Sequence, residues 1–361
     1  MRVLTVLGTR PEIIRLSRII PEVDRVADHV LVHTGQNTAD NLSRIFFEEL
    51  GVRAPDVSLG VDTSSLGRQL ATLYEGFESV LDTHRPDRVL ILGDTNSGLV
   101  AYNCKRRGIP VFHMEAGNRC YDDRVPEEVN RRVIDHCSTV LLPYTERSAE
   151  NLVREGIPRH RIYVTGNPIY EVLTAYEPQI ASNPALAKHG LTAGKYLLAT
   201  MHRAENVDDA SVMAGLLEAL TGAATAYGMP LLLSVHPRIA SKIDEKALGR
   251  AGVRAVPAMP FFEFVKLQQN AALVLSDSGT VQEECAIFRV PVITIRDTTE
   301  RPETIDAGSN IVSSTNPDAI ASAVRYLRGA VAPNTWTPPA EYLVPNVSAK
   351  IVRLLLSNVA P

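Results

Sequence analysis

Short runs of aliphatic and β-branched residues alternate with helix-periodic segments along most of the chain. The first run, RVLTVLG (2–8), is followed by PEIIRLSRIIPEV (11–23), whose apolar residues recur at helical spacing. Runs that are apolar throughout are typical of parallel strands that helices cover on both faces. The alternation therefore predicts an α/β fold made of repeated strand, loop and helix units.

The length of the chain favours two such domains, since 361 residues are many for a single hydrophobic core. A second series of strands and helices begins with KYLLATMH (195–202). We predict an N-terminal Rossmann-like domain at 1–168 and a C-terminal Rossmann-like domain at 169–344, with a cleft between them. The last helix, within 345–361, follows a Pro-containing segment and is expected to cross back to the N-terminal domain.

Composition excludes several classes of protein. The net charge of −4 and the pI of about 6.2 argue against a nucleic-acid or anionic-membrane surface. The start, MRVLTVLGTRPE, is too short an apolar run for a signal peptide, and no stretch reaches the roughly 18 apolar residues of a membrane span. The four cysteines show no CxxC spacing, so we expect reduced thiols in a cytoplasmic protein.

Ionisable residues concentrate in VFHMEAGNRCYDDRVPEEVNR (111–131). The apolar PVF before Glu115 resembles the end of a buried parallel strand, and open α/β sheets bind ligands at that end. Pro126 fits the first turn of a helix, which places Glu127 and Glu128 near the positive end of the helix dipole. The alternative is a solvated loop followed by a capped surface helix.

Other expected strand ends carry ionisable groups too. Asp94 follows one strand in LGDTNSG, His202 another in TMHRAEN, and His236 a third in SVHPR. Taken alone, each has a structural explanation, such as Asp94 capping the next helix. Together they would bring carboxylates and an imidazole to one cleft, where perturbed pKa values suit general acid and base catalysis.

Two loops are candidate phosphate sites. The segment SDSGTVQEE (276–284) leaves a strand and opens a helix, so backbone amides around Ser278, Gly279 and Thr280 would face an anion. Glu284 could accept hydrogen bonds from ribose hydroxyls. In the other domain, Arg10 in GTRP can form a fork onto a phosphate. An ordinary N-capped helix with a Gly turn is the alternative for the first of these loops.

Several common motifs are missing from the sequence. No strand is followed by G-x-G-x-x-G, so bound NAD is not expected. The chain also lacks G-x-x-x-x-G-K-[ST], H-E-x-x-H and G-x-S-x-G. Any sugar inversion would have to proceed without a redox cofactor.

A set of motifs in both halves resembles the non-hydrolysing UDP-N-acetylglucosamine (UDP-GlcNAc) 2-epimerase family. The motifs are GTRPE (8–12), TGQ (34–36), GDT (93–95), HMEAGNR (113–119), PEEVNR (126–131), HRAEN (202–206), DSGTVQEE (277–284) and RDTTERPE (296–303). The resemblance implies a glycosyltransferase-B-like fold, a homodimer and reversible conversion of UDP-GlcNAc to UDP-N-acetylmannosamine (UDP-ManNAc).

The same resemblance implies a mechanism and a set of site residues. UDP is eliminated across C1 and C2 to give 2-acetamidoglucal and is then added back with the proton on the other face. The implied catalytic residues are Asp94, Glu115, Glu127 and His202. The implied substrate-binding residues are Arg10, Arg119, Phe264 on the uracil, Ser278, Gly279, Thr280, Glu284 on the ribose, and Arg296. Neither a metal nor a cofactor is required, since Arg, His and helix-end amides can stabilise the departing charge.

Other functions stay open at this point. Within the family, the motifs are especially similar to the branch acting on modified sugars, such as UDP-diacetamido-uronic acid and the precursor of UDP-L-FucNAc. The further alternatives are a hydrolysing 2-epimerase that releases ManNAc and UDP, a glycosyltransferase, and a nucleotide-sugar-binding regulator without turnover. The carboxylates argue against the regulator, which has no use for three acid-base groups.

Overall fold

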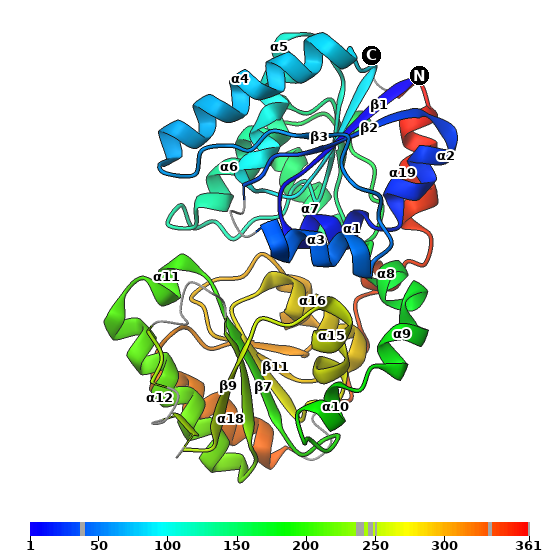
Figure 1. The fold of residues 1–361 in the computed structure, drawn as a ribbon. Coiled ribbons are helices and arrows are strands. Elements are labelled where there is room, and N and C mark those ends of the chain that lie inside the picture. Colours follow the sequence, from blue (N-terminus) through cyan, green and yellow to red (C-terminus); the bar gives the residue numbers. More distant parts are fainter. Residues whose placement is uncertain (37–39, 236–241, 245–247, 250, 331–333, 360–361) are drawn as a thin grey trace. The chain divides into compact units, whose positions relative to one another are not determined.

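The computed structural model describes residues 1–36, 40–235, 242–244, 248–249, 251–330 and 334–359. The chain forms two compact units, Met1–Thr174 with Glu341–Pro361 and Ala175–Ala340 (Figure 1). The sequence predicts the corresponding domain boundaries after residues 168 and 344. None of the described helices is long and apolar enough to span a membrane.

The first unit contains a parallel six-stranded sheet with the order β3-β2-β1-β4-β5-β6. Its strands are β1 (Arg2–Leu7), β2 (Asp28–His33), β3 (Val57–Ser58), β4 (Arg88–Leu92), β5 (Val111–Met114) and β6 (Val140–Leu142). The direction of the strand order reverses between β1 and β4. Ligands of such sheets bind beyond the carboxyl ends of the strands at this reversal, where residues 8–10 and 93–95 lie.

The second unit repeats this topology with the order β12-β11-β10-β7-β8-β9. Its strands are β7 (Leu197–Met201), β8 (Leu231–Val235), β9 (Val253–Pro257), β10 (Leu273–Ser276), β11 (Val292–Thr294) and β12 (Asn310–Val312). Here the reversal lies between β7 and β10, so His202 and the segment 277–279 follow the two strands at that point.

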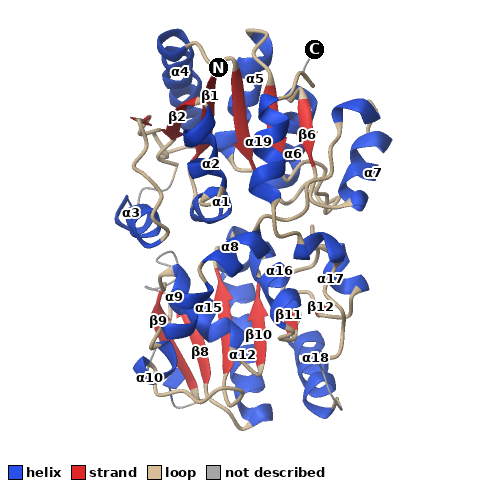
Figure 2. Ribbon diagram, turned by 90° about the vertical axis from the view of Figure 1, so that its right-hand side faces the viewer, coloured by secondary structure: helices blue, strands red, loops and turns tan. Residues whose placement is uncertain are grey.

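Helices cover both faces of each sheet (Figure 2). Those of the first unit are α1 (Arg10–Leu16), α2 (Ile19–Val26), α3 (Asp40–Glu49), α4 (Leu66–His84), α5 (Ala101–Arg106), α6 (Pro126–Cys137), α7 (Glu146–Arg154), α8 (Ile169–Ala175) and α19 (Val347–Leu356). Those of the second are α9 (Glu177–Ser182), α10 (Ala185–Lys188), α11 (Ala204–Val207), α12 (Ala210–Tyr227), α15 (Phe261–Gln269), α16 (Gly279–Phe288), α17 (Pro302–Asp306) and α18 (Pro317–Gly329). The predicted α/β class with two Rossmann-like units is confirmed.

The two-sided burial explains why the strands are apolar throughout. In β7, Leu197 packs into a cluster with α12 and α18, while Leu198 packs into another with α15 and α16. In the first unit, Leu4 of β1 belongs to the cluster with α4, and Val3 faces α2 and α19. Alternate side chains of each strand therefore enter opposite apolar layers. Fully burying one such side chain contributes about 1.5–3 kcal/mol.

The C-terminal helix α19 lies beside α2 (Figure 1). Its end is fixed by Arg88 of β4, whose Nη1 donates to the carbonyl oxygen of Ser357 at 2.7 Å. Further back, Lys350 donates to the carbonyl oxygen of Thr165 at 3.1 Å. The last helix is thus part of the first unit.

The single helix predicted over 11–23 is wrong. The chain forms α1 and α2 instead, separated by a turn at residues 17–18. Pro21 is the reason, since a proline inside a continuous helix lacks the backbone N–H and clashes with the carbonyl four residues earlier. In the first turn of α2 that N–H is not needed.

Candidate active site

The first unit places Glu115 directly after β5, as expected from the sequence. Its side chain is buried and forms an ion pair with Arg15 of α1, and it accepts a hydrogen bond from Asn118 at 3.2 Å. Glu115 has a φ of +68°, which is uncommon for a residue with a side chain. A buried carboxylate on a strained turn is typical of a functional position.

The N-cap of the helical segment Asn96–Val100 is Thr95, the residue after Asp94. The carboxylate of Asp94 pairs with Arg131 of α6, at 2.8 Å from Nε and 2.6 Å from Nη2. The backbone of this loop lies close to Glu115, because a Cβ built on Gly93 would be 3.8 Å from Oε2 of Glu115. The structure thus brings the loops of Asp94 and Glu115 together at the carboxyl edge of the sheet.

The adjacent glutamates of α6 have different environments. Pro126 opens the helix, and Glu127 and Glu128 lie in its first turn, as predicted. Glu128 is fully buried and accepts the backbone N–H groups of Cys120 and Tyr121 at 3.0 and 3.1 Å. Glu127 is partly exposed. Glu128 therefore holds the loop in place, whereas Glu127 is accessible to a substrate.

Arg10 and Glu12 follow β1, on the other side of the sheet's reversal point from Asp94. The guanidinium of Arg10 lies over the ring of Phe46, 5.7 Å from its centroid, and burial lowers its pKa. Glu12, which sequence reasoning missed, accepts Thr9 N–H at 2.9 Å and the Thr95 hydroxyl at 2.7 Å. Thr9 and Glu12 have the spacing of a capping box, and that signal could have identified Glu12.

Glu12 should give the stability a specific pH dependence. Burial raises its pKa from 4.5 to about 7, although hydrogen bonds from Thr95, Gly8 and Thr9 oppose the shift. A raised carboxyl pKa stabilises the fold fully below about pH 4.5, and this contribution is lost as the pH rises through 7. The difference between the folded and unfolded pKa values of Glu12 corresponds to roughly 3 kcal/mol of unfolding free energy.

We therefore expect the free energy of unfolding of Glu12→Gln, measured by urea denaturation, to decline less between pH 4.5 and 7 than that of the wild type. Glu22→Gln, on the adjacent helix α2, is the control and should leave the slope unchanged. A wild-type protein whose unfolding free energy does not decline over this range would contradict the prediction.

Arg119, four residues after Glu115, is engaged in buried ion pairs. Its guanidinium is fully buried and pairs with Asp135 at 2.7 Å and with Glu155 at 2.5 Å. These partners hold its pKa above the usual range despite burial. Its placement favours a structural role over the substrate contact predicted from the sequence.

In the second unit, His202 and Asp277 form a pair at the reversal between β7 and β10. Nδ1 of His202 lies 2.9 Å from Oδ1 of Asp277, and the same carboxylate accepts the backbone N–H groups of His202 and Arg203, each at 2.9 Å. Burial alone would raise the pKa of Asp277, but His202 and the two amides hold it well below its usual range. The ionised Asp277 therefore orients the imidazole of His202.

The segment from Ser278 forms the start of α16, as predicted. The Ser278 hydroxyl lies 2.9 Å from that of Thr280, so it pairs with a side chain and not with a first-turn amide. Backbone N–H groups at a helix start form an anion site. Gly279, the first residue of the helix, is buried, and so is Glu284 further along it.

The two remaining predicted residues of this unit have partners of their own. Arg296 is buried and donates to Glu300 at 3.0 Å, and Glu300 also pairs with Arg203 at 3.1 Å. Phe264 is partly buried against the apolar cluster of α15 and α16. His236 lies outside the described residues.

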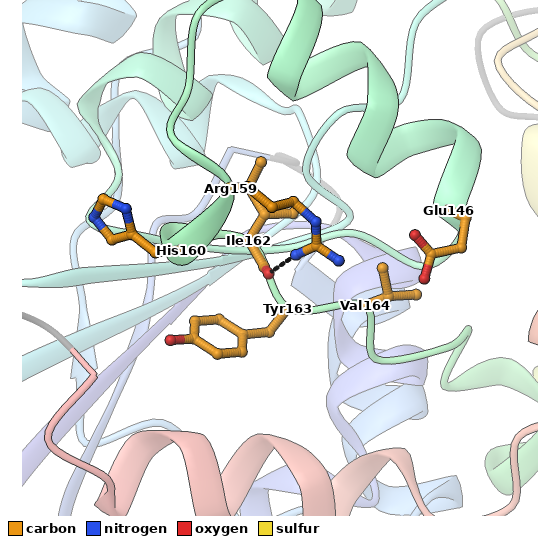
Figure 3. A pocket seen from close by; sticks show the side chains of 6 residues that line it. All are labelled: Glu146, Arg159, His160, Ile162, Tyr163 and Val164. Atoms are coloured by element: carbon orange, nitrogen blue, oxygen red, sulfur yellow. Dashed lines mark hydrogen bonds between the residues drawn. The ribbon is translucent and has the colours of Figure 1, made fainter.

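A hollow of about 490 Å³ in the first unit is separate from this set of residues (Figure 3). It is lined by Glu146, Arg159, His160, Ile162, Tyr163 and Val164. Arg159 is tied to its own loop, since Nη1 donates to the carbonyl oxygen of Ile162 at 2.5 Å.

Among the described residues no cluster of three or more His, Cys, Asp or Glu could hold a metal ion.

Comparison with known proteins shows the family of this chain. The profile of the UDP-N-acetylglucosamine 2-epimerase family matches residues 22–356. The chain belongs to the UDP-N-acetylglucosamine 2-epimerase family.

Three relatives of this 2-epimerase family illustrate the similarity. The chain is 37% identical over 338 residues to the UDP-N-acetylglucosamine 2-epimerase of Methanocaldococcus jannaschii, covering 91% of this chain and 92% of the relative. The structure of that enzyme with UDP-GlcNAc and UDP has a TM-score of 0.91 and covers 99% of each chain. The UDP-N-acetylglucosamine 2-epimerase of Rickettsia bellii has a TM-score of 0.92 at 40% identity, covering 99% of this chain and 97% of that one.

The third is the UDP-2,3-diacetamido-2,3-dideoxy-D-glucuronate 2-epimerase of Pseudomonas aeruginosa. It is 33% identical over 334 residues, covering 91% of this chain and 93% of the relative. The 2-epimerase family and the glycosyltransferase-B-like fold inferred from the motifs are thus confirmed.

Proposed function

We propose that this epimerase interconverts UDP-GlcNAc and UDP-ManNAc without hydrolysis, by eliminating UDP to form 2-acetamidoglucal and adding it back. The observation that carries the proposal is the set of acid-base carboxylates on the first unit. Glu115 is buried against Arg15, Asp94 is paired with Arg131, and Glu127 is accessible at the start of α6. A binding protein has no need for this chemistry.

Elimination at C1 and C2 requires a base for the C2 proton and stabilisation of the departing diphosphate. We assign proton removal and return to Asp94, Glu115 and Glu127, because epimerisation delivers the proton to the opposite face and so uses more than one group. His202 is assigned to the leaving diphosphate, since Asp277 orients its imidazole at the carboxyl edge of the second sheet. A cationic imidazole offsets negative charge as the C1–O bond breaks.

The nucleotide contacts are assigned mainly to the second unit. The amides at Ser278, Gly279 and Thr280 are assigned to the diphosphate. In the first unit, Arg10 is assigned to a phosphate. Glu284 would accept the ribose hydroxyls, Phe264 would pack on the uracil and Arg296 would contact the substrate through its guanidinium. We also propose a homodimer in the cytoplasm that needs no redox cofactor or metal.

A modified UDP-sugar is the alternative substrate. The 33% identity to the P. aeruginosa enzyme named for UDP-2,3-diacetamido-2,3-dideoxy-D-glucuronate supports it. Comparing kcat/KM for UDP-GlcNAc and for this uronate measures directly which substrate the enzyme prefers. Release of free ManNAc and UDP as the main products would indicate the hydrolysing type of enzyme instead.

Turnover in deuterated water should place deuterium at C2 of both recovered sugar nucleotides, without added NAD or metal. Proton loss and return at C2 occur in the elimination mechanism, and solvent exchanges with the carboxyl group that carries the proton. The anomeric NMR signals report both the epimer ratio and the label. Epimerisation without label would be incompatible with this mechanism.

A further inference from the structure

A buried charge cluster lies directly beneath the loops of Asp94 and Glu115. It consists of His113 on β5, Asp135 on α6, Arg119 after the Glu115 turn and Glu155 at the end of α7. His113, Asp135 and Arg119 are almost completely inaccessible to solvent. Charges buried to this degree are costly unless they are paired, so the cluster requires an explanation.

The partners of His113 determine its protonation state. Nε2 lies 2.8 Å from the carbonyl oxygen of Gly93, which can only accept a hydrogen bond. Nδ1 lies 2.8 Å from Oδ1 of Asp135. Burial would raise the pKa of Asp135, but hydrogen bonds and charges from His113 and Arg119 lower it below its usual range, so this carboxylate also accepts. Both ring nitrogens therefore face hydrogen-bond acceptors, and each can donate only if it carries a proton.

With a doubly protonated His113 the cluster as a whole would be neutral, with two cations and two carboxylates in alternation. Arg119 donates to Asp135 at 2.7 Å and through Nε to Glu155 at 2.7 Å. Loss of the His113 charge would leave an unbalanced carboxylate in a buried position. Breaking a buried pair by removing one partner is strongly destabilising for this reason.

Three members of the cluster, His113, Asp135 and Arg119, also hold backbone atoms of the two catalytic loops. His113 donates to Gly93, the residue before Asp94, and Gly93 N–H donates to Met114 at 3.1 Å. Beyond Glu115, Asp135 accepts the N–H of Gly117 at 3.2 Å. Arg119 then donates to the carbonyl oxygen of Asn118 at 2.8 Å. These contacts lie on both sides of the strained backbone at Glu115.

We propose that His113, as an imidazolium between Gly93 and Asp135, is a positioning residue that fixes the backbone of the two acid-base carboxylates Asp94 and Glu115. This inference rests on the proposed function, which makes those carboxylates catalytic. A strained φ at Glu115 persists only when its surroundings hold it, and the cluster supplies that restraint. His113 itself is almost completely buried.

His29 offers a matched control in the same sheet. Its ring is also buried, with Nδ1 2.6 Å from Asp24 and Nε2 2.8 Å from the Thr5 hydroxyl. It lies at the opposite end of the strands from the catalytic loops, at the start of β2. His29→Gln therefore removes a buried imidazole and its contact with the exposed Asp24, without a direct contact to Asp94 or Glu115.

The first experiment compares turnover with binding. We expect His113→Gln and Asp135→Asn each to lower kcat about 10- to 100-fold, because misplacing a catalytic group is costly, with KM and UDP affinity changed less than about twofold. The double variant restores neutrality, so its loss should be smaller than the product of the two single losses. Full kcat in His113→Gln, with a Tm decrease like that of His29→Gln, would overturn the proposal.

A second experiment does not depend on activity. In protein labelled with ¹⁵N-histidine, NMR should show two ring N–H protons on His113 at neutral pH, and a single N–H would overturn the proposal. Hydrogen exchange should accelerate at the amides of Gly93 and Gly117 in His113→Gln but not in His29→Gln. Unchanged exchange at both amides would also overturn it. Should the wild type fail to epimerise any UDP-sugar, the proposed function fails, while these two measurements still decide the role of His113.

Discussion

Glu115→Gln and Glu127→Gln are each expected to reduce turnover about 10²- to 10⁴-fold, because each substitution removes a proton-transfer group while keeping the size of the side chain. Affinity for UDP should change little, since the proposed nucleotide contacts are the amides at Ser278 and the side chain of Glu284. Three measurements separate the effects. The rate of epimer formation gives the turnover, calorimetric titration gives the affinity for UDP, and the Tm reports stability.

Glu128→Gln provides the internal contrast for this prediction. Glu128 neighbours Glu127 on α6 but is fully buried, accepting two loop amides and pairing with Arg131 at 2.8 Å. Its replacement should lower the Tm markedly, as expected for a buried group that holds a loop. Glu150→Gln, on the exposed face of α7, should leave turnover and Tm unchanged. Near-wild-type turnover in both Glu115→Gln and Glu127→Gln would remove the stretch 111–131 from the mechanism.

The sequence predicts the central strands because their apolar runs reflect burial on both faces. It predicts the edges less well: β3, β9 and β12 are not among the expected strands, being short or, like β9, partly exposed. In such strands only one face or neither is fully buried, so the apolar run that marks β1 or β7 is weak.

Site prediction shows a similar division. Residues that follow a strand directly, such as Asp94, Glu115 and His202, are predictable from position, because parallel strands bring their carboxyl ends to one edge. The partners of these residues are not predictable from position. Arg131 and Asp277 come from helices or loops far away in the chain, and only the fold shows that Arg119 pairs inward and that Glu12 joins two loops.

Asp277→Asn is expected to destabilise the protein by roughly 2–4 kcal/mol at neutral pH, because a buried carboxylate with several donors is replaced by an uncharged amide. Asp277 is inaccessible and accepts from two backbone amides and from Asn206 at 3.2 Å, besides its pair with His202. Turnover should fall as well, by about 10- to 100-fold, because the imidazole of His202 loses the carboxylate that orients it. Urea denaturation and the kcat at a temperature well below the Tm measure the two losses.

The pH dependence of this variant distinguishes an ionised Asp277 from a neutral one. A lowered carboxyl pKa contributes stability that is present above the unfolded value of 3.8 and is lost as the pH falls through the folded value. The difference in unfolding free energy between wild type and Asp277→Asn should therefore be full above about pH 5 and should shrink in acid. This is the opposite sign from Glu12, whose contribution is lost as the pH rises. Asp208→Asn, at an exposed position between α11 and α12, is the control. A difference that stays constant from pH 3 to 8 would show that the charge of Asp277 contributes nothing and that His202 is held by packing alone.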